Sequence, residues 1–151
     1  MIHIERRPYL DPVAAALVDA VLAEYVGLYG GDGDGTPVDP TQFEPPGGAF
    51  LVAWLDGHPA ACGGWRTHPS GAAEIKRMYT VPAARGRGVA MAVLRALEES
   101  ARAAGRKRVI LETGYLQPEA IALYQKAGYV RIPDFGHYKD EVGVRSFGRE
   151  L

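Results

Sequence analysis

The segment with the clearest chemical signature carries two glycines and two arginines in four residues, Arg85-Gly86-Arg87-Gly88. Glycine lets a chain turn tightly and lets a bulky anion approach the backbone N–H groups. The apolar pattern after Gly88 indicates a helix, whose first N–H groups are free and lie at the positive end of the helix dipole. The arginines add charge and fork-shaped donors. The segment therefore predicts a diphosphate site.

Three other interpretations of this segment compete. A P-loop is excluded because no Gly-Lys-Ser/Thr follows. A dinucleotide-binding fingerprint is disfavoured because it requires a small residue at the position where this chain has Met91. An ordinary glycine-rich turn with two solvated arginines stays open, since short glycine motifs are weak evidence on their own.

Composition limits the classes of protein to which the chain can belong. Its 151 residues are one domain, and with 47% apolar and 23% charged residues it is typical of a globular protein. The net charge of -1 gives no electrostatic argument for a nucleic-acid or membrane partner. The single cysteine, Cys62, excludes an internal disulfide and a thiolate-rich metal site, and no histidine pair has metal-ligand spacing, so we expect no metal.

The N-terminal region shows neither a secretory signal nor a membrane span. Its first apolar stretch, residues 13–18, is interrupted by Asp19 and is far shorter than the roughly 20 residues that a span requires. We therefore expect a cytoplasmic protein.

The elements that must position the glycine-rich segment follow from periodicity and from turn residues. A long loop rich in glycine and proline, residues 30–48, is of the kind that often forms a lid over a site. The expected strands are residues 2–4, 49–54, 59–65, 73–81 and 109–111, with one or two antiparallel strands in the tail, residues 129–151, around residues 135–138. The expected helices are 12–29, 88–104 and 118–127.

The order of these elements predicts the fold class. Strand, helix and strand over residues 73–111 form a right-handed βαβ unit. The hairpin around Asp56-Gly57 and the tail add antiparallel strands. The prediction is one α/β (α+β) domain, residues 1–151, with a mixed, mostly antiparallel central sheet and helices on both faces.

Two motifs resemble the GCN5-related N-acetyltransferase (GNAT) superfamily. Arg85-x-x-Gly88-x-Ala90 matches its Arg/Gln-x-x-Gly-x-Gly/Ala signature, and the resemblance extends upstream over residues 78–82. Residues 120–129 look like the family's Ala-x-x-Leu-Tyr-x-Lys-x-Gly-Phe/Tyr segment. About the last half of the chain is covered, and two motifs at the expected separation are more specific than either alone.

The resemblance implies an enzyme that binds acetyl-CoA as co-substrate and transfers the acetyl group directly to an amine. The turn would hold the pyrophosphate, and the strand before it would hydrogen-bond the pantetheine arm where it splays from the strand at residues 109–111. Gln117 stands where the family often has asparagine, so either its longer amide reaches the arm or that contact is lost. The cofactor-binding residues so implied are Met78, Tyr79, Thr80, Arg85, Gly86, Arg87, Gly88, Val89, Ala90, Met91 and Gln117.

The chemistry of acetyl transfer needs a base, an oxyanion donor and an acid. The amine must lose a proton before it attacks, the oxyanion needs a donor such as a strand N–H near Met78 or Tyr79, and the departing thiolate needs a proton. The resemblance implies Tyr124 as the acid. Two glutamates compete for the base: Glu74 first, as in the histone-modifying branch, then Glu112 at the carboxyl end of a parallel strand, as in the ribosomal-protein branch. A water relay remains open for either.

The acceptor is less well specified by the sequence. Trp65, Arg77 and Tyr138 are the expected substrate-binding residues near the splayed strands, and Arg77 suits a carboxylate because guanidinium binds it with two parallel bonds. We expect a small-molecule or amino-acid-like amine. A protein or peptide acceptor, a non-catalytic acyl-CoA-binding domain and a homodimer remain open.

Overall fold

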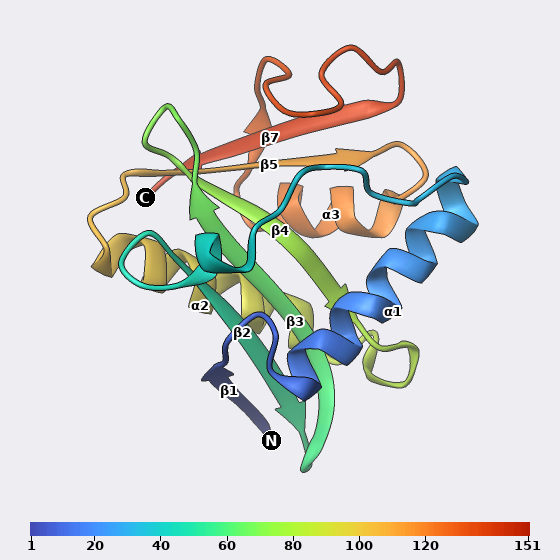
Figure 1. The fold of residues 1–151 in the computed structure, drawn as a ribbon, viewed down its shortest axis with the longest axis vertical. Coiled ribbons are helices and arrows are strands. Elements are labelled where there is room, and N and C mark those ends of the chain that lie inside the picture. The colour runs from blue at the N-terminus through green and yellow to red at the C-terminus, as the bar shows by residue number, and fades with distance from the viewer.

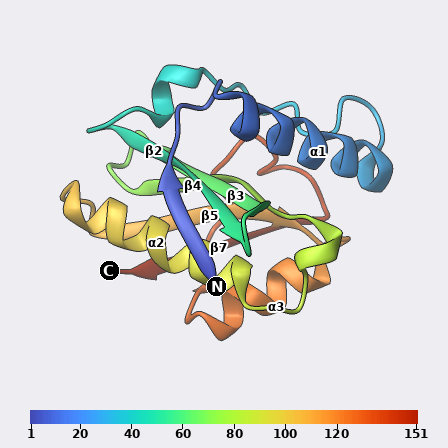
Figure 2. The same cartoon turned by 90° about the horizontal axis from the view of Figure 1, so that it is seen from below.

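A single seven-stranded sheet, in the order β1-β2-β3-β4-β5-β7-β6, organises the computed structural model, which describes all 151 residues. Helix α1 covers one face of this sheet, and α2 and α3 cover the other, as Figure 1 and the view from below in Figure 2 show. The elements are β1 (Ile2–Arg6), α1 (Pro12–Tyr29), β2 (Gly48–Leu55), β3 (His58–Thr67), β4 (Ala73–Thr80), α2 (Val89–Ala103), β5 (Arg108–Gly114), α3 (Pro118–Lys126), β6 (Val130–Arg131) and β7 (Val144–Glu150), with 3₁₀ turns at Pro40–Phe43 and Pro82–Ala84.

The strand pairing confirms the predicted fold class. Every neighbouring pair is antiparallel except β4 and β5, which are parallel and are connected through α2. This parallel pair is short: only Ala73 with Val109 and Glu74 with Ile110 are in register. From Ile75 onward the two strands diverge, while β5 continues to pair with β7 on its other edge. The sheet therefore opens in its middle, beside the C-terminal half of β4.

Helix α1 begins and ends where its sequence predicts. The Asp11 carboxylate accepts hydrogen bonds from the N–H groups of Val13 and Ala14, and Pro12 takes the first helical position. The helix is long and apolar enough to cross a membrane by length and composition, but it buries Leu17 and Val21 against the folded domain, as a core helix does.

Two apolar clusters hold the layers together. The larger one lies between the sheet and helices α2 and α3, and Trp65, Leu94 and Leu111 belong to it. The smaller one lies under α1 and includes Leu17 and Phe50. The two clusters fix the helices to opposite faces, so the opening between β4 and β5 is framed by α1 on one side and by α2 and α3 on the other (Figure 2).

The tail, residues 129–151, holds the predicted antiparallel strands on either side of residues 135–138. The strands are β6 and β7, which flank this segment, and residues 132–143 form the connection between them. Within this connection, local turns bond the Lys139 N–H to the Gly136 carbonyl and the Glu141 N–H to the Tyr138 carbonyl. Because those groups are used within turns, they are not available for a strand ladder.

Candidate active site

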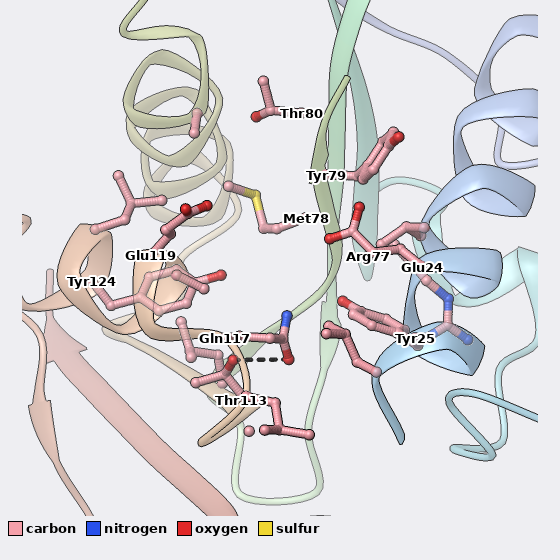
Figure 3. Close-up of a pocket in the computed structure, with 18 of the residues that line it drawn as sticks. Glu24, Tyr25, Arg77, Met78, Tyr79, Thr80, Thr113, Gln117, Glu119 and Tyr124 are labelled. Atoms are coloured by element: carbon pink, nitrogen blue, oxygen red, sulfur yellow. Dashed lines mark hydrogen bonds between the residues drawn. The ribbon is translucent and has the colours of Figure 1, made fainter. Parts of the chain in front are cut away.

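A cleft of about 1290 Å³ occupies the opening between β4 and β5. Its walls come from α1, β4, the turn that precedes α2, the end of β5, α3 and the β6–β7 connection. Figure 3 shows side chains from both faces of the sheet meeting in this space, with Tyr124 and Gln117 on one side and Tyr25 and Arg77 on the other. The cleft thus joins segments from both ends of the chain.

A β-bulge in β4 shapes the floor of the cleft. Arg77 and Met78 together lie opposite the single Gly63 of β3, and Arg77 has a positive φ of 63°. A bulge leaves ladder hydrogen bonds unmade and redirects the side chains that follow. As a result the consecutive residues Lys76 and Arg77 both reach Asp34, although neighbours in a regular strand point to opposite faces.

Asp34, in the long loop after α1, is the centre of a buried ionic cluster. Its carboxylate bonds to the Arg77 guanidinium and lies 3.4 Å from Lys76 Nζ. It also accepts hydrogen bonds from the Thr36 N–H at 3.0 Å and from the Tyr138 hydroxyl at 3.1 Å. Burial alone would raise the pKa of Asp34, but Lys76, Thr36 and Arg77 together hold this pKa well below its usual range.

Arg77 keeps one donor free. Its Nη1 bonds to Asp34 and its Nε donates to the Tyr9 hydroxyl at 3.4 Å, while Nη2 makes no hydrogen bond within the chain. Burial lowers the pKa of Arg77, but Asp34 and Tyr9 more than offset that effect and raise it. The guanidinium is therefore charged and able to bind an anion in the cleft.

Glu112, at the end of β5, lines the cleft with a partly satisfied carboxylate. Its Oε2 accepts a hydrogen bond from the Tyr138 N–H at 3.3 Å, and its Oε1 is buried without a partner. Gly136 lies against the carboxyl so closely that a Cβ there would collide with it. Burial raises the pKa of Glu112, with Lys76 opposing the shift, so this carboxyl is a better proton acceptor than an ordinary glutamate.

Tyr124 reaches the cleft from α3, and Figure 3 shows its hydroxyl turned into the cleft. The residue is only 5% exposed, and its hydroxyl makes no hydrogen bond within the chain. Burial raises the pKa of Tyr124, so the hydroxyl keeps its proton throughout the neutral range. Tyr25 of α1 faces it from the opposite wall, and burial raises its pKa too. Tyr124 can therefore serve as a proton donor.

Gln117 lies just before α3 and does not cap it. Its Oε1 instead accepts hydrogen bonds from the hydroxyls of Thr113 at 3.2 Å and Tyr29 at 3.1 Å. The first of these bonds is drawn in Figure 3. Since both donors use the oxygen, the amide NH₂ of Gln117 is the group that can donate, either to the neighbouring Tyr25 hydroxyl or to a ligand.

The glycine-rich turn has the geometry that an anion site needs. Gly86 and Gly88 have φ values of 77° and 79°, and a Cβ at either would meet only open space. Gly88 stands directly before α2, whose first N–H groups lack partners within the helix. Arg85 lines the cleft and bonds to the Thr80 carbonyl at 3.0 Å and to Glu24 at 2.8 Å.

Three of the residues predicted to belong to the site lie outside the cleft. Arg87 faces Asp56 of the β2–β3 hairpin at 3.6 Å. Trp65 is a core residue, 1% exposed, because its face of β3 packs against α2. Glu74 is 4% exposed and pairs with Arg66 at 3.1 Å, in the part of β4 that is still joined to β5.

The other predicted residues are brought together. Of the two glutamates predicted as candidates for the base, Glu112 lines the cleft and Glu74 does not. The predicted residues that line the cleft are Arg77, Met78, Tyr79, Thr80, Arg85, Gly86, Gly88, Val89, Ala90, Met91, Glu112, Gln117, Tyr124 and Tyr138.

The cleft residues that the sequence does not predict include Asp34, Lys76, Tyr25 and Tyr29. Asp34 lies in the predicted lid loop, and that expectation was the only signal for it. The sequence gives no signal for Lys76. In a regular strand Lys76 and Arg77 would point to opposite faces, and only the bulge brings both to the cleft. Tyr25 and Tyr29 repeat at helical spacing, a pattern that core residues of a helix also show.

Comparison with known proteins agrees with this geometry. The model of the acetyltransferase (GNAT) family matches residues 13–129. The chain is 34% identical over 139 residues to an IAA acetyltransferase of Azospirillum brasilense, an alignment that covers 91% of this chain and 90% of that protein. It is 35% identical over 131 residues to YjgM of Escherichia coli K12, named an uncharacterized N-acetyltransferase, covering 81% and 77% of the two chains.

A solved structure shares the whole fold. A Klebsiella pneumoniae protein provisionally named an acyl-CoA N-acyltransferase superposes with a TM-score of 0.85 at 29% identity, covering 100% of this chain and 98% of that one. The family match covers most of the chain and includes the glycine-rich turn, the splayed strands and Tyr124. This chain therefore belongs to the GNAT family of acetyltransferases and is an acyltransferase.

Proposed function

We propose that this enzyme uses acetyl-CoA to acetylate the primary amine of a small, amino-acid-like molecule. The observation that carries the proposal is the arrangement of the cleft. The cleft is lined by the open turn at Gly86 and Gly88, by the unpaired edge of β4, and by the acid–base pair of Tyr124 and Glu112.

The residues present fit an acyl-CoA. The N–H groups at the start of α2 and the Arg85 guanidinium suit a pyrophosphate, and we expect Arg85 to exchange Glu24 for a phosphate oxygen. The edge of β4 that faces away from β3 has no strand partner after Glu74, so it can hydrogen-bond the amides of an extended arm as an added strand would. The amide NH₂ of Gln117 provides a further donor.

Acetyl transfer forms a C–N bond between the acceptor amine and the acetyl carbon and breaks the thioester C–S bond. Glu112 takes the proton that the amine must lose, directly or through one water. A backbone N–H freed by the bulge at Met78 donates to the carbonyl oxygen as negative charge develops there. Tyr124 gives its proton to the departing sulfur.

The charges beside Glu112 support an acceptor that bears a carboxylate. Lys76 and Arg77 share the single carboxylate of Asp34, and Nη2 of Arg77 is free. A carboxylate on these cations and an amine near Glu112 would match the two charges of an α-amino acid.

A small acceptor is favoured because the loop after α1 is tied down over the groove. The Tyr138 hydroxyl bonds to Asp34 and accepts from the Gly35 N–H at 2.5 Å, so the long loop and the β6–β7 connection meet there. An open groove would have favoured a peptide. We also propose a cytoplasmic location, as the sequence leads us to expect.

A panel of acceptors tests the proposal. Purified protein is incubated with acetyl-CoA and either free amino acids, the corresponding methyl esters, simple alkylamines or short peptides, and thiol release and product mass are followed. We expect turnover with free amino acids and a loss of at least about tenfold in kcat/KM for the esters, which lack the charge that Arg77 binds. Saturable acetyl-CoA binding without turnover on any amine would contradict catalysis and identify a binding domain.

A further inference from the structure

Two unsatisfied polar atoms lie on neighbouring strands beneath the cleft. Glu112 of β5 and Ser146 of β7 are directly opposite each other in the antiparallel ladder. Directly opposite residues have Cβ atoms about 5 Å apart and share one face of the sheet. Glu112 Oε1 and Ser146 Oγ are both buried, and neither has a hydrogen-bond partner.

Two buried polar atoms without hydrogen-bond partners lower the stability of the fold, and no other contact in the structure explains why they are there. Ser146 is completely buried, so its hydroxyl cannot turn to solvent. A buried hydroxyl without a partner is rare in folded proteins, and so is a carboxylate oxygen in that condition. The serine hydroxyl has three staggered positions about the Cα–Cβ bond, so rotation about this one bond is the movement that can turn it toward the carboxyl on the opposite strand.

We propose that Ser146 is a positioning residue for Glu112, donating its hydroxyl hydrogen bond to Oε1 whenever the carboxyl is ionised. This leaves Oε2, which the Tyr138 N–H also holds, as the oxygen that takes the amine proton. The inference rests on the proposed function, because it assumes that Glu112 is the base.

The groups around Glu112 come from three other parts of the chain. From β4, Lys76 favours the ionised carboxyl while Glu74 opposes it. Asp34 of the long loop also opposes ionisation, and the Tyr138 N–H of the β6–β7 connection favours it. Ser146 adds a neutral donor from β7 on the side where these groups supply none, so its removal is expected to make ionisation of Glu112 harder.

The test is the pH dependence of kcat/KM in three Ser146 variants. Ser146→Ala removes the donor, Ser146→Cys keeps the volume with only a weak donor, and Ser146→Thr keeps the hydroxyl. We expect the acidic limb to move up by about one pH unit in the alanine and cysteine variants, which is about tenfold lower kcat/KM below the limb. In the alanine and cysteine variants, kcat/KM on the plateau at higher pH should stay close to wild type. The acidic limb of the threonine variant should also stay close to wild type. Ser70→Ala, in the exposed β3–β4 turn, is the control for loss of a serine hydroxyl.

Two results would overturn the inference. One is an acidic limb that does not move in the alanine and cysteine variants. The other is a uniform drop of kcat/KM at every pH, which indicates a packing defect and is checked by thermal unfolding. Glu112→Gln separates this failure from that of the proposed function: if that variant keeps full activity with the same limb, Glu112 is not the base, whatever Ser146 does.

Discussion

Tyr124→Phe separates chemistry from folding more cleanly than any other substitution in the cleft. The Tyr124 ring is 5% exposed and packs in the larger apolar cluster, which phenylalanine fills equally well. The hydroxyl has no partner within the chain, so no intramolecular hydrogen bond is lost. We therefore expect an unfolding free energy close to wild type and unchanged acetyl-CoA affinity.

The effect on turnover should be large by contrast. A positioned general acid contributes about 10²- to 10⁴-fold to a rate, so kcat of the Tyr124→Phe variant should fall by about that factor. Because burial raises the pKa of Tyr124, the hydroxyl is protonated at every pH near neutrality. The loss should accordingly be the same at pH 6 and pH 9.

Tyr129→Phe is the matched control, because its ring lies 5.8 Å from that of Tyr124. The Tyr129 hydroxyl is buried and donates to the Glu98 carboxylate at 2.8 Å, outside the cleft. Its removal should cost about 2 kcal/mol of stability, as expected for a hydrogen bond to a charged group, and leave kcat unchanged. Initial rates of thiol release, calorimetric titration with acetyl-CoA and thermal unfolding check both variants. Wild-type turnover in Tyr124→Phe, with folding intact, would refute the assignment of Tyr124 as the acid.

Three further outcomes follow from the structure. Arg85→Ala should weaken acetyl-CoA binding about tenfold in calorimetry, whereas Arg87→Ala, outside the cleft, should leave the affinity within about twofold; equal effects would contradict the placement of the two arginines. The folded-state pKa of Asp34 is lowered, so its contribution to stability is present above its unfolded pKa near 3.8 and is lost as pH falls. Denaturant unfolding should therefore show Asp34→Asn much less stable than wild type at pH 7 and equally stable in strong acid. Gly48→Ala should lower stability by about 3 kcal/mol in thermal unfolding, because the added Cβ would collide with the Gln42 carbonyl.

The predictable part of the molecule is the part governed by local chemistry. The cap at Asp11, the turn at Asp56-Gly57 and the glycines before α2 each act on backbone within a few residues of themselves, so the sequence places them correctly. The apolar period of residues 120–127 likewise places Tyr124 on a helix, whereas its assignment to the site comes from the motif that resembles the family.

The parts that sequence analysis missed depend on contacts between distant segments. The β4 bulge needs Gly63 of another strand opposite Arg77, and no local pattern marks it. The position of Glu74 depends on Arg66, a partner eight residues away on the neighbouring strand. The ion pair with Arg66 keeps the Glu74 carboxylate out of the cleft. The bounds of the tail strands depend on such contacts too, since β7 is fixed by its pairing with β5.

Calorimetric titration of the wild-type protein with acetyl-CoA tests the central claim most directly. The claim is that the opening between β4 and β5, with the N-terminus of α2 at the turn, accommodates an acyl-CoA. We predict a saturable heat of binding with one site per chain. The affinity should be reduced by Arg85→Ala and not by Arg87→Ala. The absence of any heat of binding, from protein that unfolds cooperatively on heating, would contradict it.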